Sequence, residues 1–282
     1  MNQFTRREFV GAAAVGAAAL FAGPSAVTAA TRKQLPIGVQ LYSVRNDFGK
    51  DVPGVLAGVK KLGYDGVEFA GYGGKSAADM RKILDDNGLK VCGSHIQGGL
   101  QAILGDNLNA AIEYNNTIGN NKLIIAMLTN VKTADDWKRS AGQFSAIAEK
   151  LKPHNMRLGY HNHLQEFTAL DGVMPEDIFF GEASPDVFVQ LDIGHCAHAG
   201  ADPAAYLKKY GSRILSVHAK DWIPDTRGDT IGDGIVKWDD VLTACAGASA
   251  LQWYIVEEES NKFPGLDGID KDIKALKKLL AA

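Results

Sequence analysis

The chain has 282 residues, 46% of them hydrophobic, and its 30 basic and 33 acidic side chains leave a formal net charge of −3. The charges are interspersed and form no basic stripe, which argues against a nucleic-acid partner. Three widely spaced cysteines, Cys92, Cys196 and Cys245, provide neither a disulfide framework nor a zinc-binding spacing. No glycine-rich phosphate cradle or Arg/Lys cluster is visible, so we expect a small, uncharged ligand.

The first 30 residues predict an export signal. Thr5-Arg6-Arg7-Glu8-Phe9 precedes an Ala/Gly-rich apolar stretch at 11–23 and a small-residue segment at 25–30, as in a twin-arginine signal peptide. The apolar stretch is shorter than the roughly 20 residues that a bilayer requires. We therefore expect residues 1–30 to be removed after export by the twin-arginine translocation machinery. Residues 31–282 would then be a periplasmic protein without a membrane anchor.

The remaining chain alternates short apolar runs with helical patterns. The predicted strands are Ile37–Leu41, Gly66–Phe69, Lys90–Ser94, Leu123–Ala126, Arg157–Tyr160, Val187–Leu191, Ile214–Val217 and Trp253–Val256. The clearest helices are predicted at Val52–Leu62, Ala77–Asn87, Ala134–Lys152 and Asp202–Tyr210, while the crossover at 162–186 is irregular with a short helix. Eight such units close a parallel sheet, so the sequence predicts a single α/β domain over 31–282, a (β/α)8 TIM barrel.

Polar side chains gather where the later strands end, which is where barrel enzymes carry their chemistry. Because side chains alternate along a strand, His161 and His163 share a face at the end of the fifth strand, and Glu166 begins the next loop. On the sixth strand Gln190 and Asp192 share a face. An Asp followed by a helix can also be an N-cap, so Asp192 has a structural alternative.

The seventh and eighth strands add a cation and acids. Ser216, His218 and Lys220 share one face, and Leu215, Val217 and Ala219 share the other. His218 could instead be a satisfied core histidine. In the triplet after the eighth strand we favour Glu257 over Glu258, because Glu257 is nearest the apolar run.

Other strand ends offer weaker candidates. Gln40 and Glu68 point inward at strand ends, although an arginine such as Arg45 could pair with a buried Glu68, and His95 ends the third strand. His195 could bind substrate or brace Asp192, and His95 could contact substrate or cap a strand. The aromatic rings of Trp222 and Trp238 could stack on a sugar or simply pack.

These motifs together resemble the sugar phosphate isomerase/epimerase family, the xylose-isomerase-like barrels that include inosose dehydratase and the ketose 3-epimerases. The segments that carry the resemblance are Gly38–Tyr42, Gly66–Glu68, Tyr160–His163 with Glu166, Leu191–His195, His218–Asp221, Gly232–Gly234 before Trp238, and Val256–Glu257. The resemblance implies one divalent metal held by carboxylates and a histidine from strands five to eight. Matching positions are Asp192, His218 and Glu257, with Glu166 as the nearest acid for strand five.

One position departs from the ketose epimerases. Those enzymes carry a glutamate within strand five, whereas this chain has Tyr160-His161 there. The departure favours the Tyr-His-x-His branch, which is similar to inosose dehydratase and to enzymes acting on keto-sugars.

A site of carboxylates and one imidazole suits Mn²⁺, with Mg²⁺, Co²⁺ or Zn²⁺ as alternatives. Such an ion makes a C–H beside a carbonyl acidic by stabilising an enediolate, which leads to epimerisation, isomerisation or β-elimination. His163, Glu166 and Glu257 are the expected proton-transfer residues, and Lys220 is the expected oxyanion donor. The expected substrate contacts are Gln40, Glu68, His95, His161, His195 and Asp233.

We expect the substrate to be a non-phosphorylated keto-sugar, keto-glycoside or cyclitol, because phosphorylated sugars are mainly cytoplasmic. The alternative is a periplasmic barrel that binds carbohydrate without turnover. Family members often associate, so the resemblance also allows a homo-oligomer.

Overall fold

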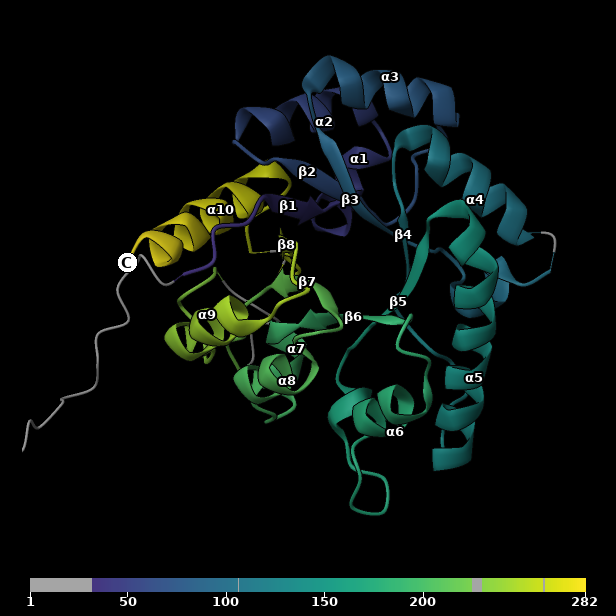
Figure 1. The fold of residues 1–282 in the computed structure, drawn as a ribbon. Coiled ribbons are helices and arrows are strands. Elements are labelled where there is room, and N and C mark those ends of the chain that lie inside the picture. Colours follow the sequence, from purple (N-terminus) through teal and green to yellow (C-terminus); the bar gives the residue numbers. More distant parts are fainter. Residues whose placement is uncertain (1–31, 106, 225–229, 261) are drawn as a thin grey trace, which may run out of the picture.

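The computed structural model describes residues 32–105, 107–224, 230–260 and 262–282, and the predicted signal peptide lies outside them. Eight parallel strands pair in chain order, and β1 also pairs with β8, so the sheet is a closed barrel surrounded by helices (Figure 1). The strands are β1 (Ile37–Gln40), β2 (Gly66–Phe69), β3 (Lys90–His95), β4 (Lys122–Ile125), β5 (Arg157–His161), β6 (Phe188–Asp192), β7 (Ile214–Ala219) and β8 (Trp253–Val256). The predicted (β/α)8 TIM barrel is confirmed.

The α-helices are α1 (Arg45–Phe48), α2 (Val52–Lys61), α3 (Ala77–Asn87), α4 (Asn107–Ile118), α5 (Ala134–Leu151), α6 (Pro175–Glu182), α7 (Ile193–His198), α8 (Pro203–Tyr210), α9 (Trp238–Gly247) and α10 (Leu266–Ala281). Short 3-10 turns occupy Leu41–Val44, Gly99–Ile103, Lys152–His154 and Gln165–Phe167. The longest helix, α5, begins at a capping box in which Thr133 Oγ accepts the Asp136 N–H (3.2 Å) and the Asp136 carboxylate accepts the Thr133 N–H (3.0 Å). No helix in the described part of the chain is long and apolar enough to cross a bilayer.

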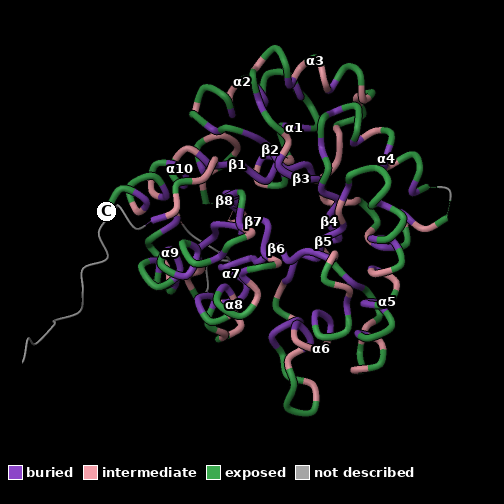
Figure 2. Tube along the Cα trace, viewed as in Figure 1, coloured by how far each residue is buried: buried purple, intermediate pink, exposed green. Residues whose placement is uncertain are grey.

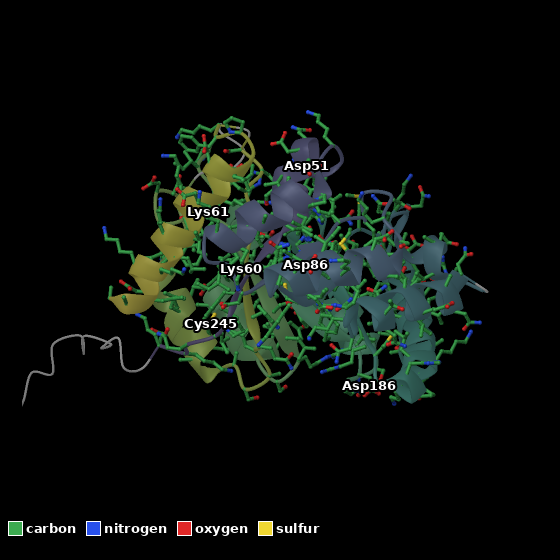
Figure 3. The ribbon with its side chains drawn as sticks, turned by 90° about the horizontal axis from the view of Figure 1, so that it is seen from above. Asp51, Lys60, Lys61, Asp86, Asp186 and Cys245 are labelled. Carbon is green, nitrogen blue, oxygen red and sulfur yellow. The ribbon has the colours of Figure 1, made fainter. Side chains whose placement is uncertain are left out.

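The strands are buried on both faces, whereas the helices expose their outer faces (Figure 2). One core lies between strands and helices, and Figure 3 shows side chains filling this layer and covering the outer surface. Two smaller clusters stand apart from that core, one of them formed by Ile124, Phe188 and Leu215. The prediction that Leu215 shares the outer face with Val217 is wrong, because a register shift opposite Val189 and Gln190 gives β7 an extra residue there.

Candidate metal and active site

Four potential metal ligands converge at the carboxyl ends of β5 to β8. Ligand atoms of His161, Asp192, His218 and Glu257 all lie within 4.8 Å of one another, and all four residues are buried. His161 and Asp192 end their strands, and Glu257 directly follows β8, so neighbouring parallel strands bring the groups to one level. The structure therefore brings Asp192, His218 and Glu257 together, as the sequence predicts, but with His161 beside them.

Asp192 uses its two carboxylate oxygens differently. Oδ1 accepts the His195 N–H (2.7 Å) and caps α7. Oδ2 is buried without a hydrogen-bond partner in the described chain and lies 3.8 Å from both His218 Nδ1 and Lys220 Nζ. Burial raises the pKa of Asp192 above its ordinary value, although Lys220 opposes this shift. The predicted alternatives, helix cap and ligand, are therefore compatible.

His218 lies between two carboxylates. Its Nδ1 is 3.0 Å from Glu257 Oε2, and its Nε2 is 2.6 Å from Glu68 Oε1. Burial lowers the pKa of His218, but the two carboxylates outweigh it and raise the pKa to about 10. A carboxylate behind an imidazole is the usual way to orient a metal-binding histidine. Glu68 therefore fixes the ring so that Nδ1 faces the other ligands.

Glu68 differs from its predicted role as a substrate contact, because it is fully buried and accepts hydrogen bonds. Its donors are Gln40 Nε2 (2.8 Å), His218 Nε2 (2.6 Å), His95 Nε2 (3.0 Å) and Gln190 Nε2 (2.7 Å). Burial raises the pKa of Glu68, but the two histidines lower it well below its usual value. Arg45, the alternative partner, instead donates to the Tyr42 carbonyl (2.8 Å).

Gln190 is a site residue that side-chain alternation along β6 places on the correct face, although no role was predicted for it. Its Nε2 donates to Glu68 Oε2 (2.7 Å) and Ser216 Oγ (2.9 Å), so its Oε1 is the acceptor. That oxygen lies 2.7 Å from His95 Nε2 and 3.1 Å from His161 Nδ1. His161 therefore carries its hydrogen on Nδ1.

The lone pair of His161 consequently lies on Nε2 and faces the ligand cluster. The distance from Nε2 to Asp192 Oδ2 is 4.0 Å. Burial lowers the pKa of His161 well below its ordinary value, as does His218, which keeps the ring neutral. A neutral imidazole beside an unpartnered carboxylate oxygen fits a divalent cation. His161 is therefore the strand-five residue that could hold a metal, whereas its predicted role was a substrate contact.

Glu166 is not part of this cluster, which corrects its predicted roles as ligand and proton-transfer group. Its buried carboxylate accepts hydrogen bonds from the Tyr160 hydroxyl, from the His163 N–H (2.7 Å) and from Gln165 Nε2 (3.0 Å). Tyr160 precedes His161 and so faces the helix layer, where its ring packs against Phe179. Glu166 therefore anchors the loop after β5 to the outer core.

Lysine and histidine side chains surround the ligand cluster at the carboxyl end of the barrel. Lys220 Nζ contacts Glu259 and lies 3.4 Å from Glu257 Oε2 and 3.2 Å from His195 Nε2. Burial lowers the pKa of Lys220, but the surrounding carboxylates raise it overall, so the ammonium remains charged. Burial and Lys220 lower the pKa of His195 to about 3. The His163 ring is 4.8 Å from the His195 ring, and its Nδ1 has no partner within the described ranges.

Asp233 is exposed, and no described contact brings it to the cluster. Its neighbours serve a structural role around Asp221. This buried carboxylate accepts the N–H groups of Trp222 (2.8 Å), Gly232 (2.8 Å) and Val236 (3.1 Å) and the Trp238 Nε1–H (2.7 Å). A Cβ at Gly234 would lie 2.1 Å from Asp221 Oδ1, so the loop requires glycine there. Trp238 therefore packs, while Trp222 stacks on His198 with ring centroids 3.6 Å apart.

Residues 56–279 match the family described as xylose isomerase-like TIM barrel, and the chain belongs to this family. A rhizopine catabolism protein, MocC, of Rhizobium meliloti is 23% identical over 257 residues, which cover 76% of this chain and 77% of that relative. Inosose dehydratase 2 of Bacillus cereus is 26% identical over 151 residues, covering 46% of this chain and 50% of the relative. This match thus spans about half of the dehydratase.

Solved structures show the same fold. A sugar phosphate isomerase/epimerase from Parabacteroides distasonis ATCC 8503 superposes with a TM-score of 0.75 at 23% identity, covering 87% of this chain and 98% of that one. The IOLI protein, solved with a binding zinc atom, superposes with a TM-score of 0.69 at 15% identity, covering 88% of this chain and 98% of that one.

Proposed function

We propose that the protein is a divalent-metal-dependent isomerase, epimerase or dehydratase acting on a non-phosphorylated keto-sugar, keto-glycoside or cyclitol. The observation that carries the proposal is the buried, unpartnered Asp192 Oδ2 within the cluster of His161, His218 and Glu257. Relatives named as inosose dehydratases support the carbohydrate class. The word dehydratase in their names supports loss of water among the candidate reactions.

His161 Nε2, Asp192 Oδ2, His218 Nδ1 and Glu257 would hold the cation. Two imidazoles and two carboxylates suit Mn²⁺ or Zn²⁺ better than Mg²⁺, which prefers oxygen ligands and water. The zinc atom of the structurally similar IOLI protein supports this choice. When bound, the cation would polarise a substrate carbonyl and its adjacent hydroxyl.

The surrounding side chains would then move protons. His163, which is partly exposed and whose ring lies 4.9 Å from that of His161, would remove the proton beside the carbonyl. Lys220, held charged by Glu257 and Glu259, would stabilise negative charge on a substrate oxygen or protonate a leaving oxygen. Proton transfer of this kind contributes about 10²–10⁴-fold to the rate.

A cavity of about 670 Å³ begins where β3 and β4 end, and it falls within the roughly 300–1,000 Å³ common for small-molecule sites. Leu100, Leu128 and Gln143 are among its lining residues. Arg139, the cation among its described lining residues, is paired with Asp136 (3.0 Å). None of its lining residues is a metal ligand, so the preference for an uncharged sugar rests on the sequence, which shows neither a glycine-rich phosphate cradle nor an Arg/Lys cluster. We also propose periplasmic action after twin-arginine export, on the strength of residues 5–30.

The test combines elemental analysis of protein purified without chelator with deuterium uptake from D₂O into keto-sugars, 3-keto-glycosides and inososes. Wild type should hold one divalent ion and exchange one substrate proton. His161→Ala should lose both, whereas Glu166→Gln should retain the metal, because its carboxylate faces the outer core.

Metal retention in His161→Ala together with loss in Glu166→Gln would restore the ligand set predicted from sequence. Wild type that binds a sugar of this panel without metal and without exchange would establish a carbohydrate-binding protein instead of an enzyme.

A further inference from the structure

A second polar cavity lies at the opposite end of the barrel from the metal ligands. Its volume is about 490 Å³, and it is lined where β3, β4 and β5 begin and where α4 ends. The lining cations are Arg81, Lys90 and Lys122, joined by His154 and several asparagines. No carboxylate belongs to the described lining. The cations are far apart in sequence, so inspection of the sequence shows no basic cluster.

Lys122 is the central residue of this cavity. It is only 9% exposed, and its Nζ donates to Asn121 Oδ1 (3.1 Å). No carboxylate of the described residues lies within ion-pairing distance of Lys122. A buried ammonium in these surroundings is costly unless an anion accompanies it.

Neighbouring residues do not neutralise the positive charge of Lys122. In the strand register Lys122 lies opposite Arg157, whose positive charge disfavours the Lys122 ammonium. Glu68 and the Cys92 thiol, both in the barrel interior, favour the charged form of Lys122. Glu68, however, already accepts hydrogen bonds from four donors. Burial keeps the pKa of Cys92 well above its ordinary value, so its thiol is neutral and supplies no counter-charge. Asp186, labelled in Figure 3, pairs instead with Lys152 (2.7 Å).

Arg81 supplies an independent indication. Its Nη1 donates to the Ile118 carbonyl (2.6 Å) and its Nη2 pairs with Asp85 (2.7 Å), but its buried Nε has no partner among the described side and main chains. The Nε–H is closed to solvent, but the side chain is 29% exposed and lines the cavity, where a guanidinium fixed by these contacts suits an oxyanion. Trp253, though buried, also lines the cavity, where an organic group attached to the anion would contact it.

We propose that this cavity is an anion-binding site that takes phosphate, free or as a monoester, between Lys122 and Arg81. The anion would supply the counter-charge that Lys122 lacks. The site is separate from the proposed metal centre and does not depend on the proposed reaction.

Calorimetry and thermal melting of the purified protein with inorganic phosphate and with phenyl phosphate test the proposal. Wild type should bind saturably and gain thermal stability, and Lys122→Met should bind about tenfold or more weakly. Without phosphate, Lys122→Met should melt at or above the wild-type temperature, because it removes an unpaired buried charge. Tighter binding of phenyl phosphate would identify an ester whose ring lies on Trp253, and equal affinity would identify free phosphate.

Two controls and one substitute variant make the result decisive. Lys82→Gln removes an exposed charge on α3 that pairs with Asp86 (2.7 Å), so it should bind like wild type. His218→Ala should retain phosphate binding, and loss there would place the anion on the metal and overturn the proposal. Exposed Lys90→Gln, which should weaken binding, replaces Lys122→Met if that variant does not fold. No binding to wild type, or unchanged binding in the lining variants, would also overturn the proposal.

Discussion

At the scale of single residues, one amide determines how the candidate metal ligands are presented. Glu68 can only accept hydrogen bonds, so it fixes the orientation of the Gln190 amide, which in turn fixes the hydrogen of His161 on Nδ1. The same Glu68 accepts His218 Nε2. One buried pair, Glu68 and Gln190, thus sets the tautomer of His161 and the ring orientation of His218.

Replacing Gln190 with Leu should weaken metal binding without touching a ligand. The variant leaves Glu68 Oε2 and His161 Nδ1 without their partner, so we expect about 10–100-fold lower metal affinity. Unpaired buried polar groups should also cost about 1–3 kcal/mol in the free energy of unfolding. Titration of metal into apo-protein and urea denaturation measure the two effects. Unchanged affinity would show that Gln190 does not orient His161.

Side-chain alternation accounts for what could be predicted at this scale. On its own it places Asp192 and His218 on the inner face of the barrel. It also places His161 there, but the family resemblance directs attention to an acid and hence to Glu166. The path of that loop depends on the Tyr160 hydroxyl, which belongs to the opposite face and leaves no local sequence signal.

At the scale of elements, α6 buries an acid that the site does not use. Glu176 is 1% exposed, and its Oε2 has no partner within the part of the chain that the structure describes. Burial raises the pKa of Glu176 well above its ordinary value, as do Glu166 and Asp177. The folded protein therefore favours the protonated form.

Glu176→Gln should stabilise the protein increasingly as pH rises. Because the folded pKa is raised, the stabilisation from the protonated carboxyl is complete below the unfolded pKa of about 4.5 and is lost as pH rises towards the folded pKa. The Gln variant has no carboxyl to ionise, so its stability does not fall in this way. Its free energy of unfolding should exceed that of wild type by about 1–3 kcal/mol in alkaline buffer, and the difference should vanish near pH 4. Chemical denaturation across this pH range measures it. A constant difference would assign the effect to packing.

The loop after β7 depends on Asp221 in a similar way. Asp221→Asn keeps the size but replaces an acceptor oxygen with a donor, so it should cost about 2–4 kcal/mol. Because this loop begins directly after Lys220, substrate affinity should fall as well. Thermal melting and the KM of the reaction test this, with exposed Asp233→Asn as the matched control that should change neither.

At the scale of the whole molecule, closure of the barrel brings ligands from separate strands to one place. The alternation of apolar runs and helices predicts this architecture, and the predicted helices agree with α2, α3, α5 and α8 to within a residue or two. The extra residue of β7 and the basic cavity could not be predicted, because both depend on register and on contacts between distant segments.

Metal removal should lower the stability of the whole domain, since the ligands come from four strands of one sheet. Metal at about 100 times its dissociation constant would add about 2.7 kcal/mol. We expect chelation to lower the melting temperature of wild type but not that of His161→Ala. Calorimetry of both proteins, with and without chelator, provides the measurement. An equal decrease in both would show that the cation binds elsewhere.

The contacts of Glu68 reach from β2 across the barrel to Gln190 on β6 and His218 on β7. A chain divided between β4 and β5 would therefore separate every ligand of the cluster from the carboxylate that orients one of them. Two such half-barrels, produced as separate polypeptides, could recover metal affinity only by reassembling around this acid. Metal uptake would then report complementation of the fragments, and Glu68→Ala in the amino-terminal half would abolish the signal.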